Sequence, residues 1–212
     1  MEADFWHKKW EINEIGFHIT EANPLLVKYF PALDLKQTNR VFVPLCGKTL
    51  DIGWLLSNGY RVVGAELSKT AIEQLFQGLG IEPIISMIDS ITHYSGDNID
   101  IFVGDVFLLT KDLLGPVDAI YDRAALVALP ELMRERYTAH LATITNNAQQ
   151  LLISFDYDQN AMAGPPFSIS NEEIKRHYDS IYHVNQLGSH DVAGGLKGIC
   201  KANENVWLLK QK

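Results

Sequence analysis

Apolar and polar residues follow two periods along this chain. From about residue 40, short apolar runs rich in β-branched residues alternate with segments whose apolar residues recur at helical spacing. This alternation is typical of a parallel sheet covered by helices and predicts an α/β protein. The predicted strands are Val41–Leu45, Arg61–Glu66, Ile99–Val103, Val117–Tyr121, Gln150–Asp156 and, near the end, Ile181–Leu187 and Asn205–Lys210.

Helices are predicted in the intervals between these strands. Their starts carry residues that favour helix initiation, such as Ser68, Pro130 and the Ser170/Glu173 pair of a capping box. The predicted helices are Thr49–Asn58, Ser68 to about Gly78, Pro130–Leu141 with Leu132, Met133, Tyr137 and Leu141 on its apolar side, and Ser170 to about Tyr178. A hairpin is also predicted within Ile91–Val103, turning at residues 95–98.

The first forty residues differ from the rest. Phe5, Trp6, Trp10, Ile15 and Phe17 make an aromatic-rich amphipathic stretch, and Asn23-Pro24 is predicted to cap a short helix ending near residue 30. This segment either packs on the edge of the sheet or forms a lid over a ligand. With no repeat or linker, the prediction is a single domain over 1–212, with residues 1–40 as an N-terminal aromatic lid.

Composition and charge exclude several classes of partner, metal site and cellular location. The net charge is −8, with 47% hydrophobic and 21% charged residues. Such an acidic chain without a basic stripe is not expected to bind nucleic acid. No apolar run of about 18 residues is present to span a membrane, and the charged start lacks the apolar core of a signal peptide. The two cysteines, Cys46 and Cys200, form no CxxC pair, so no metal site is expected. A cytoplasmic protein is predicted.

The stretch VFVPLCGKTLDIGWLL, which starts at Val41, contains the Gly-Lys-Thr of a phosphate-binding loop. That loop needs a glycine five places before Gly47, where this chain has Phe42. A dinucleotide fold would place G-x-G-x-x-G here, and only one of the three glycines is present. This disfavours a nicotinamide-dependent oxidoreductase. Cys46 has no local base to activate it and is interpreted as a packing residue.

Acidic residues at the predicted strand ends indicate a nucleoside site. Glu66 ends the second strand and lies 19 residues after Gly47, close to the ~20 expected of a ribose-binding acid. The alternative for Glu66 is a solvated strand-end carboxylate. Asp105 follows the third strand and is a candidate for binding an adenine amino group, with Val106 and Phe107 covering the ring.

Two further segments indicate an acceptor site. Asp122-Arg123 follows the fourth strand, where Arg123 is either a structural ion-pair partner or a guanidinium that meets an electron-rich substrate. After the fifth strand, Met162, Pro166 and Phe167 lie in a stiff loop with an apolar face suited to a flat ring. The [DN]-P-P-[YFW] signature of enzymes that methylate base amino groups is absent.

These residues lie within motifs that resemble a known family. The ordered segments are FWHKKW, IGFH, FVPLCGKTLDIGWL, VVGAELS, GDVFLL, YDRAALVALP, RERYTAHL and DYDQNAMAGPPFS. The chain resembles a bacterial thiopurine S-methyltransferase, a class I S-adenosylmethionine-dependent enzyme. The resemblance extends from about residue 5 to about residue 170, and the last forty residues match poorly. It implies a Rossmann-like sheet of seven, mostly parallel strands, and a monomer.

The resemblance also implies residue roles. By this similarity the cofactor is S-adenosyl-L-methionine, Trp10 folds over it, and Leu45 and Gly47 line its pocket. Glu66 would hold the ribose hydroxyls and Asp105-Val106 would flank the adenine. Arg123 would lie between cofactor and substrate. An arginine common near the carboxyl end of the family is missing, which leaves Lys197 as its stand-in.

The expected function is methyl transfer to the sulfur, or to selenium or tellurium, of a small aromatic or heterocyclic thiol such as a thiopurine. Arg123 is expected to support the anionic acceptor electrostatically, with Asp122 orienting it, while Met162, Pro166 and Phe167 bind the ring. Two alternatives remain open. One is a non-catalytic S-adenosylmethionine-binding regulatory module, and the other is a methyltransferase for a different small-molecule acceptor.

Overall fold

The computed structural model describes residues 3–12, 14 and 21–212, so the predicted roles of Ile15 and Phe17 fall outside the described residues. The chain divides into two compact units, Met1–Asp118 and Ala119–Lys212. The described residues form a mixed sheet of nine strands. The expectation of seven strands was therefore wrong, because β3 (Ile84–Ile88) and β4 (Ile91–Gly96) were not counted among them.

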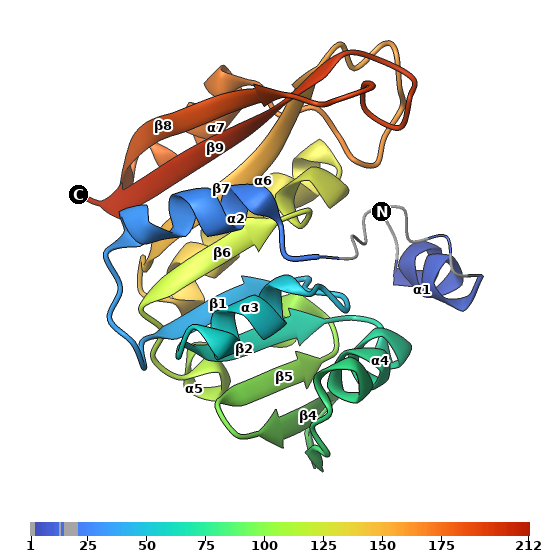
Figure 1. The fold of residues 1–212 in the computed structure, drawn as a ribbon, viewed down its shortest axis with the longest axis vertical. Coiled ribbons are helices and arrows are strands. Elements are labelled where there is room, and N and C mark those ends of the chain that lie inside the picture. The colour runs from blue at the N-terminus through green and yellow to red at the C-terminus, as the bar shows by residue number, and fades with distance from the viewer. Residues whose placement is uncertain (1–2, 13, 15–20) are drawn as a thin grey trace. The chain divides into compact units, whose positions relative to one another are not determined.

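The first unit has the strand order β3-β4-β5-β2-β1 (Figure 1). Strands β1 (Arg40–Pro44), β2 (Arg61–Glu66) and β5 (Ile99–Val103) are parallel, as predicted, and the antiparallel pair of β4 and β5 confirms the expected hairpin. The three parallel strands are largely buried on both faces, which explains their continuous apolar runs. Their carboxyl ends carry the candidate cofactor residues.

Strand β3 was missed because its sequence carries no burial signal. It pairs only with β4 at the edge of the sheet, and the residues along it are exposed rather than alternating in and out. Ile84 and Met87 are 75% and 67% exposed. An apolar run that neither alternates nor is buried does not resemble a half-buried strand.

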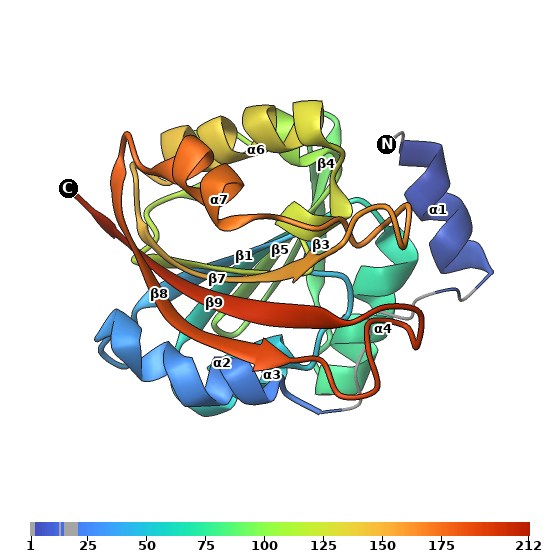
Figure 2. The ribbon, with the colours of Figure 1, turned by 90° about the horizontal axis from the view of Figure 1, so that it is seen from above.

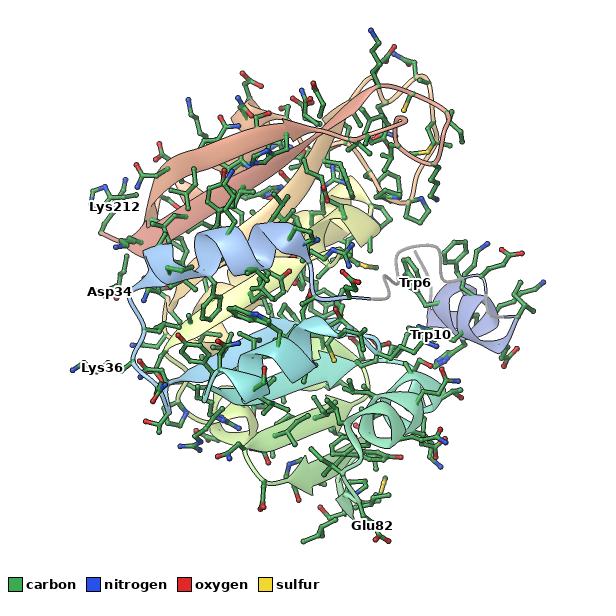
Figure 3. The ribbon with its side chains drawn as sticks, in the orientation of Figure 1. Trp6, Trp10, Asp34, Lys36, Glu82 and Lys212 are labelled. Carbon is green, nitrogen blue, oxygen red and sulfur yellow. The ribbon has the colours of Figure 1, made fainter. Side chains whose placement is uncertain are left out.

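Helices of the first unit begin and end at the signals found in the sequence. Ser68 Oγ accepts from the Ala71 N–H at the start of α4 (Lys69–Leu79), and Gly80 ends that helix with a left-handed φ of 68°. The remaining helical segments are α1 (Ala3–Glu11), α2 (Pro24–Tyr29), η1 (Phe30–Leu33), α3 (Asp51–Ser57), η2 (Val106–Leu108) and α5 (Lys111–Leu114). Figure 3 shows Trp6 and Trp10 projecting from one side of α1.

The second unit has the strand order β6-β7-β9-β8. Strand β6 (Ala119–Arg123) is parallel to β7 (Gln149–Tyr157), whereas β9 (Ala202–Gln211) is antiparallel to both β7 and β8 (Tyr182–Asp191). Figure 2 shows α6 (Glu131–Ile144) and α7 (Asn171–Tyr178) on the same side of β7, β9 and β8. A short 3₁₀ helix, η3 (Leu126–Ala128), follows β6.

Three details of the second unit differ from expectation. Leu132 is 86% exposed, so its assignment to the apolar side of α6 was wrong, whereas Tyr137 and Leu141 are buried there as predicted. Strand β6 begins and ends two residues later than expected. Asp122 and Arg123 are consequently its last two residues rather than the first residues of the following loop, and their backbone is paired with β7.

Candidate active site

The turn after β1 folds back onto the end of β2. Leu45 has a left-handed φ of 46° and Gly47 one of 52°. Within this turn the Cys46 N–H donates to the Ala65 carbonyl oxygen at 3.0 Å. A leucine in the left-handed region is strained, and such residues cluster at functional sites. The turn therefore depends on its neighbours to keep this shape.

Glu66, the last residue of β2, holds the same turn through its carboxylate. Oε2 accepts from the Gly47 N–H at 2.7 Å, and Oε1 accepts from the Ser68 N–H at 2.9 Å. Glu66 is only 6% exposed, so the alternative of a solvated strand-end carboxylate was wrong. Burial raises the pKa of Glu66, and the backbone hydrogen bonds from Ser68 and Gly47 partly offset this rise. Each oxygen keeps capacity for a second hydrogen bond, which suits a ligand hydroxyl.

Cys46 is buried beside this turn, in agreement with its interpretation as a packing residue. Burial, and then the charge of Glu66, raise the pKa of the Cys46 thiol well above its usual value. The thiol is therefore held in its unreactive form. A Cβ at Gly64 would lie 3.0 Å from Cys46 Sγ, so β2 needs a glycine at this point. The Gly47 N–H already donates to Glu66, which also argues against a phosphate-binding loop.

Asp105 and Val106 follow β5 at the adjacent strand end. Asp105 is exposed, and its Oδ1 accepts from the Phe107 N–H at 3.0 Å, which caps η2. Val106 is buried at the start of η2. The cap fixes the Asp105 carboxylate while its second oxygen keeps the capacity to accept from an amino group. The predicted adenine contacts are compatible with this geometry and stay predictions.

Asp122 is buried in the second unit with 0% exposure. Its Oδ1 accepts from the Leu126 N–H at 3.1 Å, and its Oδ2 accepts from the Tyr137 hydroxyl at 2.7 Å. Burial raises the pKa of Asp122 to about 6, against the opposing effect of these hydrogen bonds. The bonds fix the turn in which Ala124 has a left-handed φ of 63°. The predicted orientation of Arg123 by Asp122 stays a prediction.

Arg123 shares a sheet face with an acidic residue that sequence reasoning missed. In the strand register Arg123 lies opposite Ile153, which lies opposite Val206. Glu204 is two residues from Val206 and so points to the same face. Burial raises the pKa of Glu204, and the positive charges of Arg123 and His190 counteract that rise. Glu204 directly precedes the predicted strand Asn205–Lys210, and the register of that strand could not be known from the sequence.

The loop with Met162, Pro166 and Phe167 is held by the surrounding backbone. The Tyr157 hydroxyl donates to the Pro166 carbonyl oxygen at 2.6 Å, and the Phe167 N–H donates to the Val127 carbonyl oxygen at 2.6 Å. Met162 packs against the buried cluster that contains Tyr157. The three predicted acceptor residues therefore belong to one fixed loop.

Lys197, the proposed stand-in for a missing arginine, contacts this same loop. Its Nζ donates to the Pro165 carbonyl oxygen at 2.7 Å. The ammonium group thus stabilises the loop backbone, and its contact with a substrate stays a prediction.

Two further features are absent from the described part of the chain, a metal-binding cluster and a membrane-spanning helix. Within residues 3–12, 14 and 21–212, no group of three or more His, Cys, Asp or Glu side chains could hold a metal ion. In the described part of the chain, no helix is long and apolar enough to cross a membrane.

Comparison with known proteins identifies close relatives. A family model described as thiopurine S-methyltransferase (TPMT) matches residues 1–212. The chain is 54% identical over 212 residues to a thiopurine S-methyltransferase of Xanthobacter autotrophicus, with 100% of both chains covered. It is 50% identical over 211 residues to that of Teredinibacter turnerae, with 100% of this chain and 98% of the relative covered.

Solved structures with low sequence identity share the fold. A TehB-like SAM-dependent methyltransferase from Corynebacterium glutamicum aligns with a TM-score of 0.58 at 12% identity, covering 99% of this chain and 98% of that one. A 1,6-didemethyltoxoflavin-N1-methyltransferase from Burkholderia thailandensis, solved with bound 1,6-didemethyltoxoflavin and S-adenosylhomocysteine, aligns with a TM-score of 0.65 at 15% identity. The alignment covers 99% of this chain and 87% of that one. The expected Rossmann-like methyltransferase fold is confirmed.

Proposed function

The chain belongs to the thiopurine S-methyltransferase family, and from that premise we propose that it methylates the sulfur of a small aromatic or heterocyclic thiol such as a thiopurine. The reaction class is S-adenosylmethionine-dependent methylation of a small-molecule acceptor. What we propose beyond this reaction class is that the acceptor atom is sulfur. The buried carboxylate of Glu66, with one backbone N–H on each oxygen, is the observation that carries the proposed site.

The residues around the turn after β1 suit the binding of S-adenosylmethionine. Glu66 is buried and accepts its hydrogen bonds from backbone amides, so its remaining acceptor capacity suits the two ribose hydroxyls. Leu45 and Gly47 would line the pocket, Asp105 and Val106 would contact the adenine, and Trp10 would cover it. When bound, the cofactor supplies a methyl group activated by a sulfonium.

Arg123 is proposed to bind the acceptor as an anion. An acidic heterocyclic thiol is largely deprotonated near neutral pH, so the guanidinium needs only to orient and stabilise the thiolate. Attack by the thiolate sulfur would form a new bond to the methyl carbon while the bond from that carbon to the sulfonium sulfur breaks. The negative charge of the thiolate and the positive charge of the sulfonium are both lost in this step. The chain contributes alignment and exclusion of water. Asp122 serves as a positioning residue, and Met162, Pro166 and Phe167 contact the ring.

The proposal also includes where the protein acts, which partners it has and its oligomeric state. The acidic composition supports a protein that acts in the cytoplasm on small molecules, without nucleic-acid or membrane partners. We expect it to act as a monomer. A pocket for a soft, polarisable sulfur also suits selenium and tellurium compounds. We therefore include the methylation and detoxification of these compounds in the proposal.

A release assay on the purified protein tests the proposed acceptor class. S-adenosylhomocysteine formation is measured with S-adenosylmethionine and a panel of aromatic thiols, aliphatic thiols, selenols and tellurite. The proposal expects the highest kcat/KM with an aromatic or heterocyclic thiol. Turnover confined to hydroxyl or amino acceptors in an extended panel would refute the sulfur acceptor and favour a different small-molecule methyltransferase.

Calorimetry separates the remaining alternatives. Titration with S-adenosylhomocysteine and with NAD is expected to give binding with the first ligand only. S-adenosylhomocysteine binding without turnover of any acceptor would favour the regulatory module. NAD binding in its place would contradict the proposed cofactor site.

A further inference from the structure

Phe167 lies against a buried guanidinium. The Arg134 side chain, on α6, is 6% exposed, and its Cζ lies 5.7 Å from the centroid of the half-buried Phe167 ring. Gly164 lies against the ring too, because a Cβ there would be 2.7 Å from Phe167 Cδ1. The guanidinium and Gly164 therefore define where the ring lies, and the part of it that stays accessible has a fixed orientation.

The guanidinium itself is held by contacts to two other parts of the second unit. Arg134 Nε donates to Glu173 Oε1 on α7 at 2.6 Å, and one terminal nitrogen donates to the Leu129 carbonyl oxygen at 2.7 Å. His177 Nε2 lies 3.2 Å from the same carboxylate oxygen. Burial raises the pKa of Glu173, but the hydrogen bonds and charges of His177 and Arg134 outweigh it and lower the pKa overall. Glu173 is thus an anion that anchors Arg134.

A second ion pair joins the same helices but has a different environment. Arg176 on α7 and Glu131 on α6 lie 2.8 Å apart, with side chains 59% and 66% exposed. An exposed pair is sufficient to link two helices at little desolvation cost, whereas burying charges is expensive and apolar residues often replace buried pairs without loss of stability. Linking the helices therefore does not by itself explain why Arg134 is buried beneath the loop.

We propose that Arg134 is a positioning residue for the acceptor, one that orients the Phe167 ring for stacking against a flat, electron-rich ring. A cation on one side of an aromatic ring draws its π-electron density toward that side. The accessible part of the ring then offers less repulsion to an anionic heterocycle stacked against it. This inference rests on the proposed function and adds to it that aromatic acceptors are preferred over aliphatic ones.

The test compares aromatic and aliphatic thiols in paired variants. Arg134→Gln alone leaves Glu173, whose side chain is only 12% exposed, without its arginine partner and is prone to misfold. The informative variant is therefore the double change Arg134→Gln/Glu173→Gln. With full-length protein and S-adenosylmethionine, KM for thiosalicylate is expected to rise about tenfold. The KM for S-adenosylmethionine and the kcat/KM for 2-mercaptoethanol are expected to stay within about twofold. Glu131→Gln, which breaks the exposed pair on the same helices without touching Glu173, should change none of these values.

Two more measurements distinguish positioning from general stability. In a Phe167→Leu background the Arg134→Gln/Glu173→Gln change should have no further effect on the thiosalicylate KM, because no ring remains to position. Arg134→Lys in the wild-type background should recover part of the aromatic preference, because it keeps the charge. Equal losses with aromatic and aliphatic thiols, or an unchanged thiosalicylate KM, would overturn the role of Arg134.

Failure of the proposed function can be distinguished from failure of the inference about Arg134. Absence of turnover by the wild-type protein with every thiol would refute sulfur methylation. In that case calorimetric titration of thiosalicylate into the S-adenosylhomocysteine-loaded wild type and double variant decides the inference, with about tenfold weaker binding by the variant expected. Equal binding by the two proteins, or no binding by the wild type, would contradict it.

Discussion

Glu66 in the first unit and Asp122 in the second are both buried carboxylates that close a turn at the end of a strand. Glu66 reaches from β2 to the turn after β1, where Leu45 is left-handed. Asp122 closes the turn after its own strand, where Ala124 is left-handed. In both cases a strained turn at a carboxyl edge depends on the carboxylate that accepts from its backbone.

The partners of the two carboxylates differ. Each oxygen of Glu66 accepts from one backbone N–H, and the residue keeps a small exposed fraction. Asp122 has no exposed surface, and its second oxygen accepts from the hydroxyl of Tyr137. Similar turns can thus serve two purposes. Glu66 is proposed to meet a ligand, whereas the hydrogen bonds of Asp122 keep a turn in shape.

The largest expected effect is on cofactor affinity. Glu66→Ala removes the two charge-assisted hydrogen bonds that we propose Glu66 makes to ribose hydroxyls, and it should weaken S-adenosylhomocysteine binding by about 4 kcal/mol, close to 1,000-fold. Asp122→Asn, which changes the other buried carboxylate, should alter this affinity by no more than about threefold. Calorimetry on variants shown to be folded by their thermal transitions makes the comparison. Equal weakening by both changes would remove the distinction between the two turns.

The next effect is on stability and its pH dependence. The folded pKa of Asp122 is raised from 3.8 to about 6, so the folded state holds the proton more tightly than the unfolded chain. The contribution of Asp122 to stability is therefore full below pH 3.8 and is lost as the pH rises to about 6. The loss is about 3 kcal/mol in the free energy of unfolding.

Urea unfolding between pH 4 and pH 7 measures this loss. Over this range the free energy of unfolding of Asp122→Asn should fall by about 2 kcal/mol less than that of the wild type. Tyr137→Phe removes a donor to the ionised carboxylate and should make the fall steeper. Identical slopes for the wild type and Asp122→Asn would mean that Asp122 ionises normally in the folded protein.

The smallest effect is on the chemical step. Arg123→Ala should lower kcat with an aromatic thiol by at least about tenfold, because the thiolate loses its electrostatic support, while S-adenosylhomocysteine affinity is retained. Arg176→Ala, at an exposed ion pair, is the matched control. Steady-state kinetics with calorimetry separates the two quantities. Undiminished turnover by Arg123→Ala would take this residue out of the mechanism.

The sequence predicted those parts of the fold whose signals are local. Bounds for β2 and β5 match the expected residues, because each is a buried β-branched run next to turn residues. Ser68 and Ser170 cap their helices as expected. Strand β3 escaped prediction because its exposed residues do not alternate. Leu132 was misplaced because an apolar residue at helical spacing can still face solvent.

The candidate site was predicted where its residues are close in sequence or follow a known spacing. The Gly47–Glu66 pair could be expected from its separation of 19 residues and is a direct hydrogen bond. The hydrogen bond of Tyr137 to Asp122, the electrostatic effect of Arg123 on Glu204, and the contact of Arg134 with Phe167 connect distant segments. They depend on strand register and helix rotation, which hydrophobic patterning does not determine.

The acceptor atom is tested most directly by following the methyl group. The purified protein is incubated with S-adenosylmethionine labelled with ¹³C in its methyl group and with 6-mercaptopurine, and the product is identified by NMR. The account predicts a single labelled product in which the methyl carbon is bonded to sulfur. A label on a ring nitrogen, or an unlabelled acceptor after S-adenosylhomocysteine binding has been verified, would contradict it.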